Sequence, residues 1–496
     1  MAVAVSMLDR LALTACLIRF WGTAGFEHWS ILLAATSLFA LFDFGLQMHF
    51  GNRLTWETAA GEHQTARSLY RGSNTIFLGL ALSGSLIATA VFSIPSLGEL
   101  FGLRSALAAN DRWIAAALML AVAVKLAMTN LISVYRLNRA FGLGTVLVSL
   151  VDAARILSIA ALAYLGFGPI SAAIATATVT LLGFGLFVPM DISRRFAVFA
   201  VKFERPTLLT MKGAYSNGGL FFFQNLPNLI IAQLPVLLIG GTAAKTGVLA
   251  SFLLIRTLLN FVRLLLFQVV QILGMECARL AAENRLRLMD RLYTHTNRCI
   301  AAVSGWLCGG MLSLGGPIFA FWTGQASLYR RDLMLVMIAP LLCVPSCLLA
   351  NTYLAYSNRP FYPTLGRGLQ LCIAVVLFFL VPFDDISLRL TSAICVGEVL
   401  GFAIPQIYAS PRLMDRDRLV TEIWNIAVSF ASFGVTYFLA DFTKAWLPPD
   451  TMWRFLANAL ILGSGGALII SALLLRPSQL RLVRSGATSS DIRDAA

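Results

Sequence analysis

Four basic side chains lie near the middle of long apolar stretches of this sequence, where a charge is costly. Lys125, Arg155, Arg256 and Arg263 fall in three such stretches. A basic group at the centre of a membrane helix costs about 2.5–3.5 kcal/mol even on the gentlest insertion scale. Such groups are kept where helices enclose water or bind a charged partner. The pattern therefore predicts a membrane protein that binds a negatively charged group.

The composition is that of an integral membrane protein. The 496 residues are 58% hydrophobic and 12% charged, with a mean hydropathy of +0.78, whereas soluble proteins carry about 25% charged residues. The net charge of +14 is explained by Lys and Arg in cytoplasmic loops and does not indicate a nucleic-acid partner. Eight cysteines and four histidines show no metal-site or redox spacing. We therefore expect no metal and no cofactor.

The spans and their orientation follow from hydropathy and loop charge. The loops after even-numbered stretches, together with the C-terminal tail, hold 24 Lys and Arg residues, against nine in the odd-numbered loops. The positive-inside rule then puts both termini in the cytoplasm. Asp9 and Arg10 interrupt the first stretch, so only the side of the N-terminus depends on whether that stretch spans. We expect an all-α polytopic protein with about fourteen transmembrane helices, over residues 1–20, 29–50, 70–94, 113–135, 141–165, 170–190, 214–240, 246–273, 297–321, 333–356, 362–383, 389–409, 421–443 and 452–475.

A short pattern recurs six spans apart. Arg53-Leu-Thr-Trp-Glu57 follows the second span, Arg279-Leu-Ala-Ala-Glu283 follows the eighth, and each precedes a Leu-Tyr pair. A chance match is one explanation. The other is two six-helix lobes related by a pseudo-two-fold axis along the membrane normal. The predicted organisation is an N-terminal lobe over 1–212, a C-terminal lobe over 213–415, two additional helices over 416–475 and a cytoplasmic tail over 476–496.

The helix predicted over 246–273 carries a polar stripe. Arg256, Asn260 and Arg263 recur at i, i+4 and i+7, within about 60° of one another around the helix. Glu398, in the span over 389–409, is the one candidate acidic partner in this half of the chain. An internal ion pair is the alternative to a binding role. Two arginines and one acid leave a cation in excess, so we expect a cavity that faces an anion.

The spans over 113–135 and 141–165 form a tight hairpin. Lys125 and Asp152 lie at similar distances from its turn, so they share a depth in the membrane. A structural salt bridge and a functional role in ion coupling are both open for this pair. Arg155, one turn along the helix from Asp152, is then the spare cation of this half.

Polar residues of two further spans are candidates for binding or coupling. Gln224 and Asn228 share one face of the span over 214–240 with Asn217. They form either interhelical hydrogen bonds or a wall that binds hydroxyl groups, as of a sugar. Asp43, near the inner end of the second span, is a proton or cation site, or it packs or caps a helix. Asp152 and Glu398 are the other candidates for coupling or gating.

Catalytic signatures are missing from the sequence. We find no phosphate-cradling glycine loop, no paired acidic motif and no Ser/His/Asp arrangement. The sequence therefore predicts that the protein is not an enzyme and has no catalytic residues.

Three stretches together resemble the lipid-linked oligosaccharide flippases, which are the polysaccharide branch of the multidrug/oligosaccharidyl-lipid/polysaccharide exporter superfamily. Ser37–Leu46, with its Leu-Phe-Asp-Phe-Gly-Leu core, is similar to the end of that family's second span. Gly315–Gly324 (Gly-Gly-Pro-Ile-Phe-Ala-Phe-Trp-Thr-Gly) is similar to its exit from span nine. The helix from Arg256 to Arg279 is similar to its basic span eight. The likeness covers roughly residues 10–410.

The resemblance implies a fold, a substrate and a mechanism. The fold would be a pair of six-helix bundles that exposes a cationic cavity to each side of the membrane in turn. The substrate would be an oligosaccharide repeat unit on a polyprenyl diphosphate, moved across the bacterial inner membrane to its periplasmic leaflet for exopolysaccharide or surface polysaccharide assembly. Arg256 would contact the anionic head group. Membrane lipids, a polysaccharide polymerase and a co-polymerase would be partners.

Two other functions are weighed against this one. A drug or cation antiporter on the same scaffold needs buried carboxylates, and mid-depth charge here is mainly basic. A membrane glycan polymerase or ligase ordinarily has a large outer loop with basic and histidine residues, which this sequence lacks.

Overall fold

The structure is a computed structural model, and it describes residues 2–93, 109–206, 208–242, 246–357, 359, 361–410 and 418–474. Those residues are helical for most of their length, and no strand occurs among them. Lipid offers the backbone no hydrogen-bond partner, so each apolar run satisfies its own N–H and C=O groups by coiling into a helix. The predicted all-α polytopic class is confirmed.

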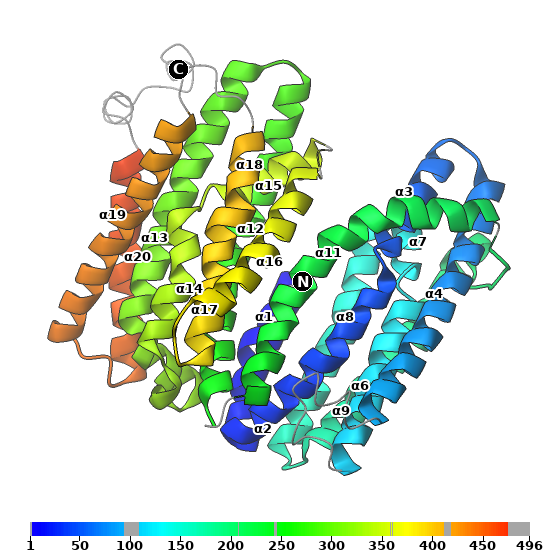
Figure 1. Cartoon of the computed structure of the whole chain (residues 1–496), viewed down its shortest axis with the longest axis horizontal. Coiled ribbons are helices and arrows are strands. Elements are labelled where there is room, and N and C mark those ends of the chain that lie inside the picture. Colours follow the sequence, from blue (N-terminus) through cyan, green and yellow to red (C-terminus); the bar gives the residue numbers. More distant parts are fainter. Residues whose placement is uncertain are drawn as a thin grey trace. The chain divides into compact units, whose positions relative to one another are not determined.

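The helices follow one another with short connections (Figure 1). Two π-helical segments, η1 (Leu8–Leu13) and η6 (Glu398–Ala403), and the 3-10 segment η2 (Leu38–Asp43) continue neighbouring helices. The α-helices used below are α1 (Ala2–Met7), α2 (Thr14–Ser37), α3 (Leu46–Ala59), α4 (His63–Ser93), α6 (Ala109–Ala127), α7 (Leu131–Leu137), α8 (Phe141–Tyr164), α9 (Pro169–Thr180), α10 (Val188–Arg195), α11 (Leu208–Thr242), α12 (Val248–Ala282), α13 (Leu286–Thr323), α14 (Arg331–Cys343), α15 (Cys347–Tyr356), α16 (Phe361–Leu380), α17 (Ile386–Gly397), α18 (Ile404–Ala409), α19 (Arg418–Trp446) and α20 (Met452–Leu474).

Eleven helices of the described chain are long and apolar enough to cross a membrane, or twelve if the bent pair α14–α15 is one span. The predicted count of fourteen is not confirmed. The first two predicted spans fall on one helical run, Ala4–Asp43, which breaks at Gly22 (φ 72°, ψ 174°). The last predicted span corresponds to α20, which ends at the edge of the described residues.

The described residues pack into two compact units. Unit 1 contains those up to Thr257 together with Pro382–Leu390, and unit 2 contains those of Leu258–Val381 and from Thr391 onward. This division falls within α12, whereas the lobe boundary predicted from the sequence lies at residue 212. Packing and internal repetition are different criteria, so the lobe boundaries stay a prediction.

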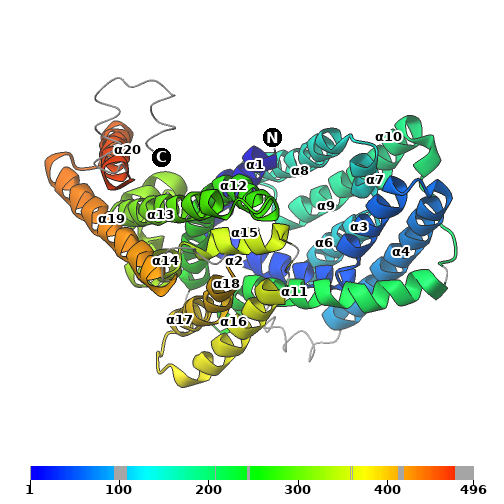
Figure 2. The same cartoon turned by 90° about the horizontal axis from the view of Figure 1, so that it is seen from above.

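The centre of unit 1 is apolar and aromatic. The helix α4 packs against α6, α6 packs against α9, and α9 packs against α8 (Figures 1 and 2). Phe50 of α3 and Phe77 of α4 are fully buried, with ring centroids 5.9 Å apart. Tyr70 and Val134 are fully buried in the same cluster. This packing fixes the helices that carry the polar residues of unit 1.

In unit 2, α13 lies along α19, and α20 packs against both (Figures 1 and 2). The two backbones approach closely at glycines. A Cβ atom on Gly305 would stand 2.0 Å from the carbonyl oxygen of Ser429, and one on Gly309 would stand 2.5 Å from that of Phe433. Small residues at such crossings let membrane helices gain dispersion contacts where no hydrophobic force acts between them.

A broken helix crosses beside this pair. α14 and α15 meet at 55°, with Pro345 in the break. A proline has no N–H, so the carbonyl four residues earlier, Leu341 O, loses its helical donor. Ser304 Oγ of α13 donates to that carbonyl at 2.8 Å. Unit 2 thus satisfies part of its broken helix from a neighbouring helix.

The close approach at Gly305 gives a direct test of this packing. Gly305→Ala should destabilise the protein by about 1–3 kcal/mol, because the new methyl group overlaps the backbone of α19. The matched Gly434→Ala change, where a Cβ meets no atom within 4 Å, should be neutral or stabilising. Thermal unfolding of the two purified variants in detergent compares them. Equal melting temperatures would contradict the packing described.

Candidate functional site

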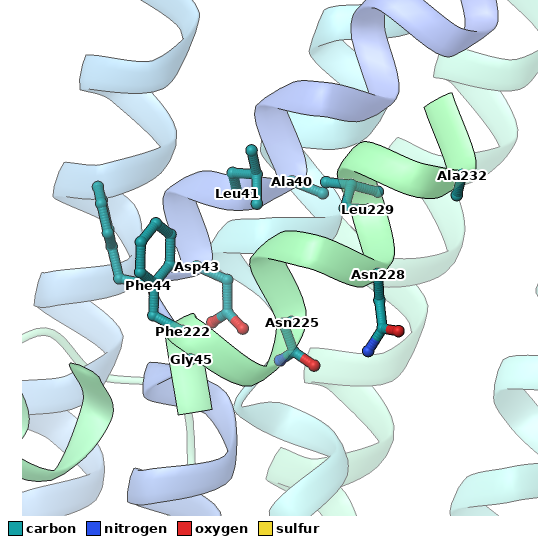
Figure 3. A pocket seen from close by; sticks show the side chains of 10 residues that line it. All are labelled: Ala40, Leu41, Asp43, Phe44, Gly45, Phe222, Asn225, Asn228, Leu229 and Ala232. Carbon is teal, nitrogen blue, oxygen red and sulfur yellow. The ribbon is translucent and has the colours of Figure 1, made fainter. Parts of the chain in front are cut away.

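Three groups of polar residues lie within the membrane-spanning part, two in unit 1 and one in unit 2. The first lines a cavity of about 330 Å³ between η2 and α11 (Figure 3). Asp43, Asn225 and Asn228 supply its polar groups, and Phe44, Phe222 and aliphatic side chains supply the rest. In Figure 3 the carboxylate of Asp43 and the two amides lie along the same side of the cavity.

A left-handed turn positions Asp43. Phe44 (φ 48°) and Gly45 (φ 71°) follow it and separate η2 from α3. One carboxylate oxygen of Asp43 accepts a hydrogen bond from the backbone N–H of Gln47 at 3.1 Å, in the first turn of α3. Asp43 therefore caps α3 and lines the cavity at the same time. The capping role, one of the alternatives for this residue, is present.

Arg256 contacts a residue that lines this cavity. Its Nη1 donates to the carbonyl oxygen of Ala232 at 2.6 Å, and Ala232 also lines the cavity. The guanidinium group stands 5.8 Å from the ring centroid of Phe252. The structure thus brings two predicted site residues, Asp43 and Asn228, to one cavity, and Arg256 is hydrogen-bonded to Ala232 of its lining. Asn225 was missed, although it lies at i−3 from Asn228 on one helix face.

The second group lines a pocket of about 390 Å³ in unit 1. Lys125 Nζ lies 3.5 Å from Asp152 Oδ1, and Arg155 Nη2 donates to Asp9 Oδ1 at 3.0 Å. Arg155 Nε is also 3.9 Å from Asp152 Oδ1. The salt bridge between Lys125 and Asp152 is therefore present. Arg155 is not the spare cation of this half, because Asp9 compensates it.

Asp9 was missed as a site residue because its charge was interpreted as an interruption of an apolar run. The signal was available: a carboxylate inside a membrane helix needs a partner, and such residues usually face other polar groups. Asp9 lies in the π-helical segment η1, and η1 packs against α8, which carries Asp152 and Arg155. Two acids and two bases give this pocket no net charge.

The third group lies in unit 2. Arg263 donates two hydrogen bonds to Glu398, each of 2.8 Å, in a bidentate pair. Glu398 is 9% exposed. Arg367 of α16 stands over the ring of Phe402, 3.4 Å from its centroid, and donates to Gln370 Oε1 at 2.6 Å. Its positive charge acts on Glu398 as well. Arg263 thus forms the ion pair with Glu398, and Arg367 adds a second positive charge nearby.

The close packing of α16 against η6 creates this group. A Cβ on Gly401 would stand 2.4 Å from the backbone nitrogen of Gln370, and one on Gly397 would stand 2.7 Å from its carbonyl oxygen. Arg367 was counted among cytoplasmic loop charges in the sequence. The packing of α16 against η6 brings Arg367 near Glu398. Local hydropathy does not predict which helices pack together.

The remaining predicted binding residues are Asn260 and Gln224. Asn260 is half-buried on α12, and the side chain of Gln224 lies outside the described residues. Their binding roles stay predictions. Carboxylates accompany Lys125, Arg155 and Arg263, and the contacts of Arg256 include a carbonyl oxygen and an aromatic ring. The surplus of positive charge expected from the sequence stays a prediction.

No family model and no curated protein matches this chain. Several solved structures match its fold. The Lipid II flippase MurJ in an inward closed conformation is 13% identical, covers 95% of this chain and 97% of its own, and has a TM-score of 0.70. An inward-facing multidrug resistance MATE transporter of the MOP superfamily is 12% identical, with coverages of 87% and 96% and a TM-score of 0.65. The eukaryotic MATE transporter AtDTX14 is 15% identical, with coverages of 86% and 95% and a TM-score of 0.56.

These likenesses define the fold of the chain. It is a multi-pass membrane protein with the polytopic helical fold shared by MurJ and the MATE transporters. This is the kind of fold that the sequence resemblance implied. Identities of 12–15% carry the fold alone.

The Arg263–Glu398 pair is open to a double-mutant test. Glu398→Leu should cost about 3–5 kcal/mol, because it leaves Arg263 and Arg367 in the protein interior without a carboxylate. Adding Arg263→Met should recover part of that loss, and the remainder reports Arg367. Thermal unfolding of the single and double variants measures this, with the surface-pair variant Arg454→Ala as a control worth about 0–1 kcal/mol. A double variant no more stable than Glu398→Leu would show that the pair is not coupled.

Proposed function

We propose that the protein is a flippase that moves a polyprenyl-diphosphate-linked oligosaccharide repeat unit from the cytoplasmic to the periplasmic leaflet of a bacterial inner membrane. The observation that supports this most is the likeness to the Lipid II flippase MurJ, which extends over 95% of this chain with a TM-score of 0.70. The product would serve exopolysaccharide or surface polysaccharide assembly. Both termini would be cytoplasmic, and a polymerase and co-polymerase would be partners.

The substrate combines a diphosphate, several sugars and a long apolar tail, and the polar groups of the protein suit the first two. Guanidinium groups bind phosphate oxygens with strong, oriented hydrogen bonds. Arg256 would contact the diphosphate, with Arg263, Arg155 and Lys125 as further cations. Asn228, Asn260 and Gln224 would bind sugar hydroxyls, and the tail would stay in lipid. The cavity beside Asp43, of about 330 Å³, is at the small end of ligand pockets.

Paired cations suit transport better than isolated ones would. An arginine already bound to a carboxylate binds phosphate only by exchanging one anion for another, so the net affinity stays moderate. A transporter must release its substrate on the far side, and a site that binds too tightly would not. Asp9, Asp152 and Glu398 would hold the basic groups between transport cycles.

Arg256 gives the direct test. Arg256→Ala should lower the transport rate roughly 10–100-fold, which corresponds to the loss of a charged hydrogen bond worth about 1.5–3 kcal/mol. Arg256→Lys should retain part of the activity, because it keeps the charge and loses the fork geometry. Surface glycan is measured in a deletion strain that carries each variant, with membrane protein quantified alongside. Arg454→Ala, an exposed ion-pair change, is the matched control, and normal glycan from Arg256→Ala would refute the assignment.

One observation favours a second function, a drug or cation antiporter. The cavity in Figure 3 has Asp43 as the one ionisable group among its lining residues, next to two amides and two aromatic rings. A carboxylate beside aromatic surfaces suits an organic cation.

Asp43 separates these two functions. If the protein is an antiporter, Asp43→Asn should abolish efflux of cationic dyes from loaded cells or proteoliposomes. If it is a flippase, the same cells should export no dye above background with or without the change, and surface glycan should depend on Arg256. Asn225→Asp, which adds a carboxylate to the same cavity, should lower glycan transport and raise any cation transport.

A further inference from the structure

The pocket of about 390 Å³ in unit 1 contains more than the two acids and two bases described above. Three hydroxyl side chains also line it, those of Ser6, Thr145 and Ser149. The rest of its lining is apolar and includes the aromatic ring of Phe141. Charged groups, hydroxyl groups and an aromatic surface therefore meet in one cavity.

One face of α8 builds much of the wall of this pocket. Phe141, Thr145, Ser149 and Asp152 recur at intervals of three and four residues, so they share one side of the helix. The segments α1 and η1 pack against α8, and Lys125 comes from α6. The η1 segment is π-helical, and such segments are rare and frequent at functional sites.

The ion pairs of the pocket leave hydrogen-bonding groups for a ligand. Lys125 Nζ and Arg155 Nε lie 3.5 Å and 3.9 Å from Asp152 Oδ1, beyond the roughly 2.7–3.2 Å of a normal N–H···O hydrogen bond. The side chain of Lys125 is 56% exposed. Among the described residues these contacts of Asp152 are thus electrostatic. The Lys125 ammonium keeps N–H donors and the Asp152 carboxylate keeps lone pairs that a ligand can use.

The hydroxyl groups of α8 are acceptors. Thr145 Oγ1 donates to the carbonyl oxygen of Phe141 at 3.0 Å, and Ser149 Oγ donates to that of Thr145 at 2.7 Å. A hydroxyl group has a single proton, so each of these oxygens is left to accept a hydrogen bond. A ligand that suits the pocket therefore brings donors for these oxygens and for Asp152, together with an acceptor for Lys125.

The charge balance of the pocket favours an uncharged ligand over a phosphate. A diphosphate would have to displace Asp9 from Arg155 or Asp152 from Lys125, and the displaced carboxylate would lose its partner at membrane depth. A sugar hydroxyl both donates and accepts, so one ring can bind Asp152 and Lys125 without changing the net charge. The C–H groups of the same ring gain dispersion contacts on Phe141.

We propose that this pocket binds an uncharged sugar ring of the transported oligosaccharide, with Lys125 and Asp152 as the hydrogen-bonding pair and Phe141 as its apolar support. The inference rests on the proposed flippase function and deepens it, because it narrows the role of Lys125 from a general cation to sugar recognition. A volume of about 390 Å³ is at the small end of ligand pockets, which suits part of a repeat unit. An acidic sugar is disfavoured, since its carboxylate would lie close to Asp9 and Asp152.

A second pocket lies next to the first. It has a volume of about 90 Å³ and is lined by Gln47, Ser133 and Arg136 together with Ile132 and Phe141. The last two residues also line the larger pocket, so the two pockets adjoin. The loop that begins at Arg136 is predicted to be cytoplasmic. The sugar site therefore extends toward the side from which the proposed substrate comes.

Three synthetic lipids test the site on the purified full-length protein in nanodiscs: farnesyl diphosphate, its glucose-linked form and its glucuronate-linked form. Glucose should tighten binding roughly ten-fold over farnesyl diphosphate alone, as expected for a hydrogen bond to a charged group, and glucuronate should not. The double variant Lys125→Met with Asp152→Leu should abolish the gain from glucose and leave the affinity for farnesyl diphosphate unchanged. It removes both charges together, so neither is left unpaired. Asp450→Ala with Arg454→Ala, at an exposed ion pair, is the matched control.

Two further variants keep the test decisive. Phe141→Leu, at a position that is 58% exposed, should lower the gain from glucose without removing it, and it serves if the double variant fails to fold. Arg256→Ala should weaken the binding of all three lipids equally, because the proposed function places that residue at the diphosphate.

The outcomes separate the sugar site from the flippase function. The sugar site alone would be overturned if the glucose-linked lipid bound no tighter than farnesyl diphosphate, if glucuronate bound tighter than glucose, or if the gain survived in the double variant. An equal loss of all three lipids in the double variant would assign Lys125 to the diphosphate and would also overturn it. Failure of the wild-type protein to bind any of the three would overturn the flippase function, and the sugar site with it.

Discussion

Charge and hydrogen-bond compensation inside an apolar solvent is the constraint on which this structure depends. Each helix satisfies its own backbone, so the remaining cost lies with polar side chains and broken helices. Lys125, Arg155 and Arg263 each have a carboxylate within ion-pair distance. The carbonyl freed by Pro345 receives a hydroxyl from α13. The arrangement of the helices within each unit is consistent with these pairings and with the close glycine contacts that permit them.

This compensation changes how the basic residues should be understood. A cation without a carboxylate partner at mid-depth would bind any anion strongly. A cation paired with a carboxylate can exchange that carboxylate for another anion. Arg263 and Arg367 lie near one carboxylate, that of Glu398, so this group has a net positive charge. Each of the two guanidinium groups still makes a hydrogen bond. Such a balance suits the repeated binding and release that a transporter requires. In contrast, the cavity beside Asp43 has an acidic lining and suits a cation better.

Compensation is incomplete at several buried polar side chains of the described residues. In unit 1, Asn130 Nδ2 donates to Ser73 Oγ and to Asn74 Oδ1, whereas Asn130 Oδ1 accepts no hydrogen bond from the described residues. In unit 2 the amides of Asn297 and Asn425 lie near Tyr293 and Glu422 without a hydrogen bond of normal geometry to any described residue. The Arg53–Glu57 and Arg279–Glu283 segments each form the same ion pair between residues four apart. The repeated pattern in the sequence therefore corresponds to similar local structures.

The sequence by itself determined the membrane class, the helical fold and most helix positions, because these depend on local hydropathy and on the backbone's need for hydrogen bonds. It also identified the Lys125–Asp152 and Arg263–Glu398 pairs, since few acids lie at mid-depth. Only the tertiary structure decided that Asp9 compensates Arg155 and that Arg367 joins Glu398. It also decided that the polar end of the α13–α19 contact is unsatisfied. Those facts depend on which helices lie side by side and in what register, and close packing of small residues such as Gly305 and Gly401 sets both.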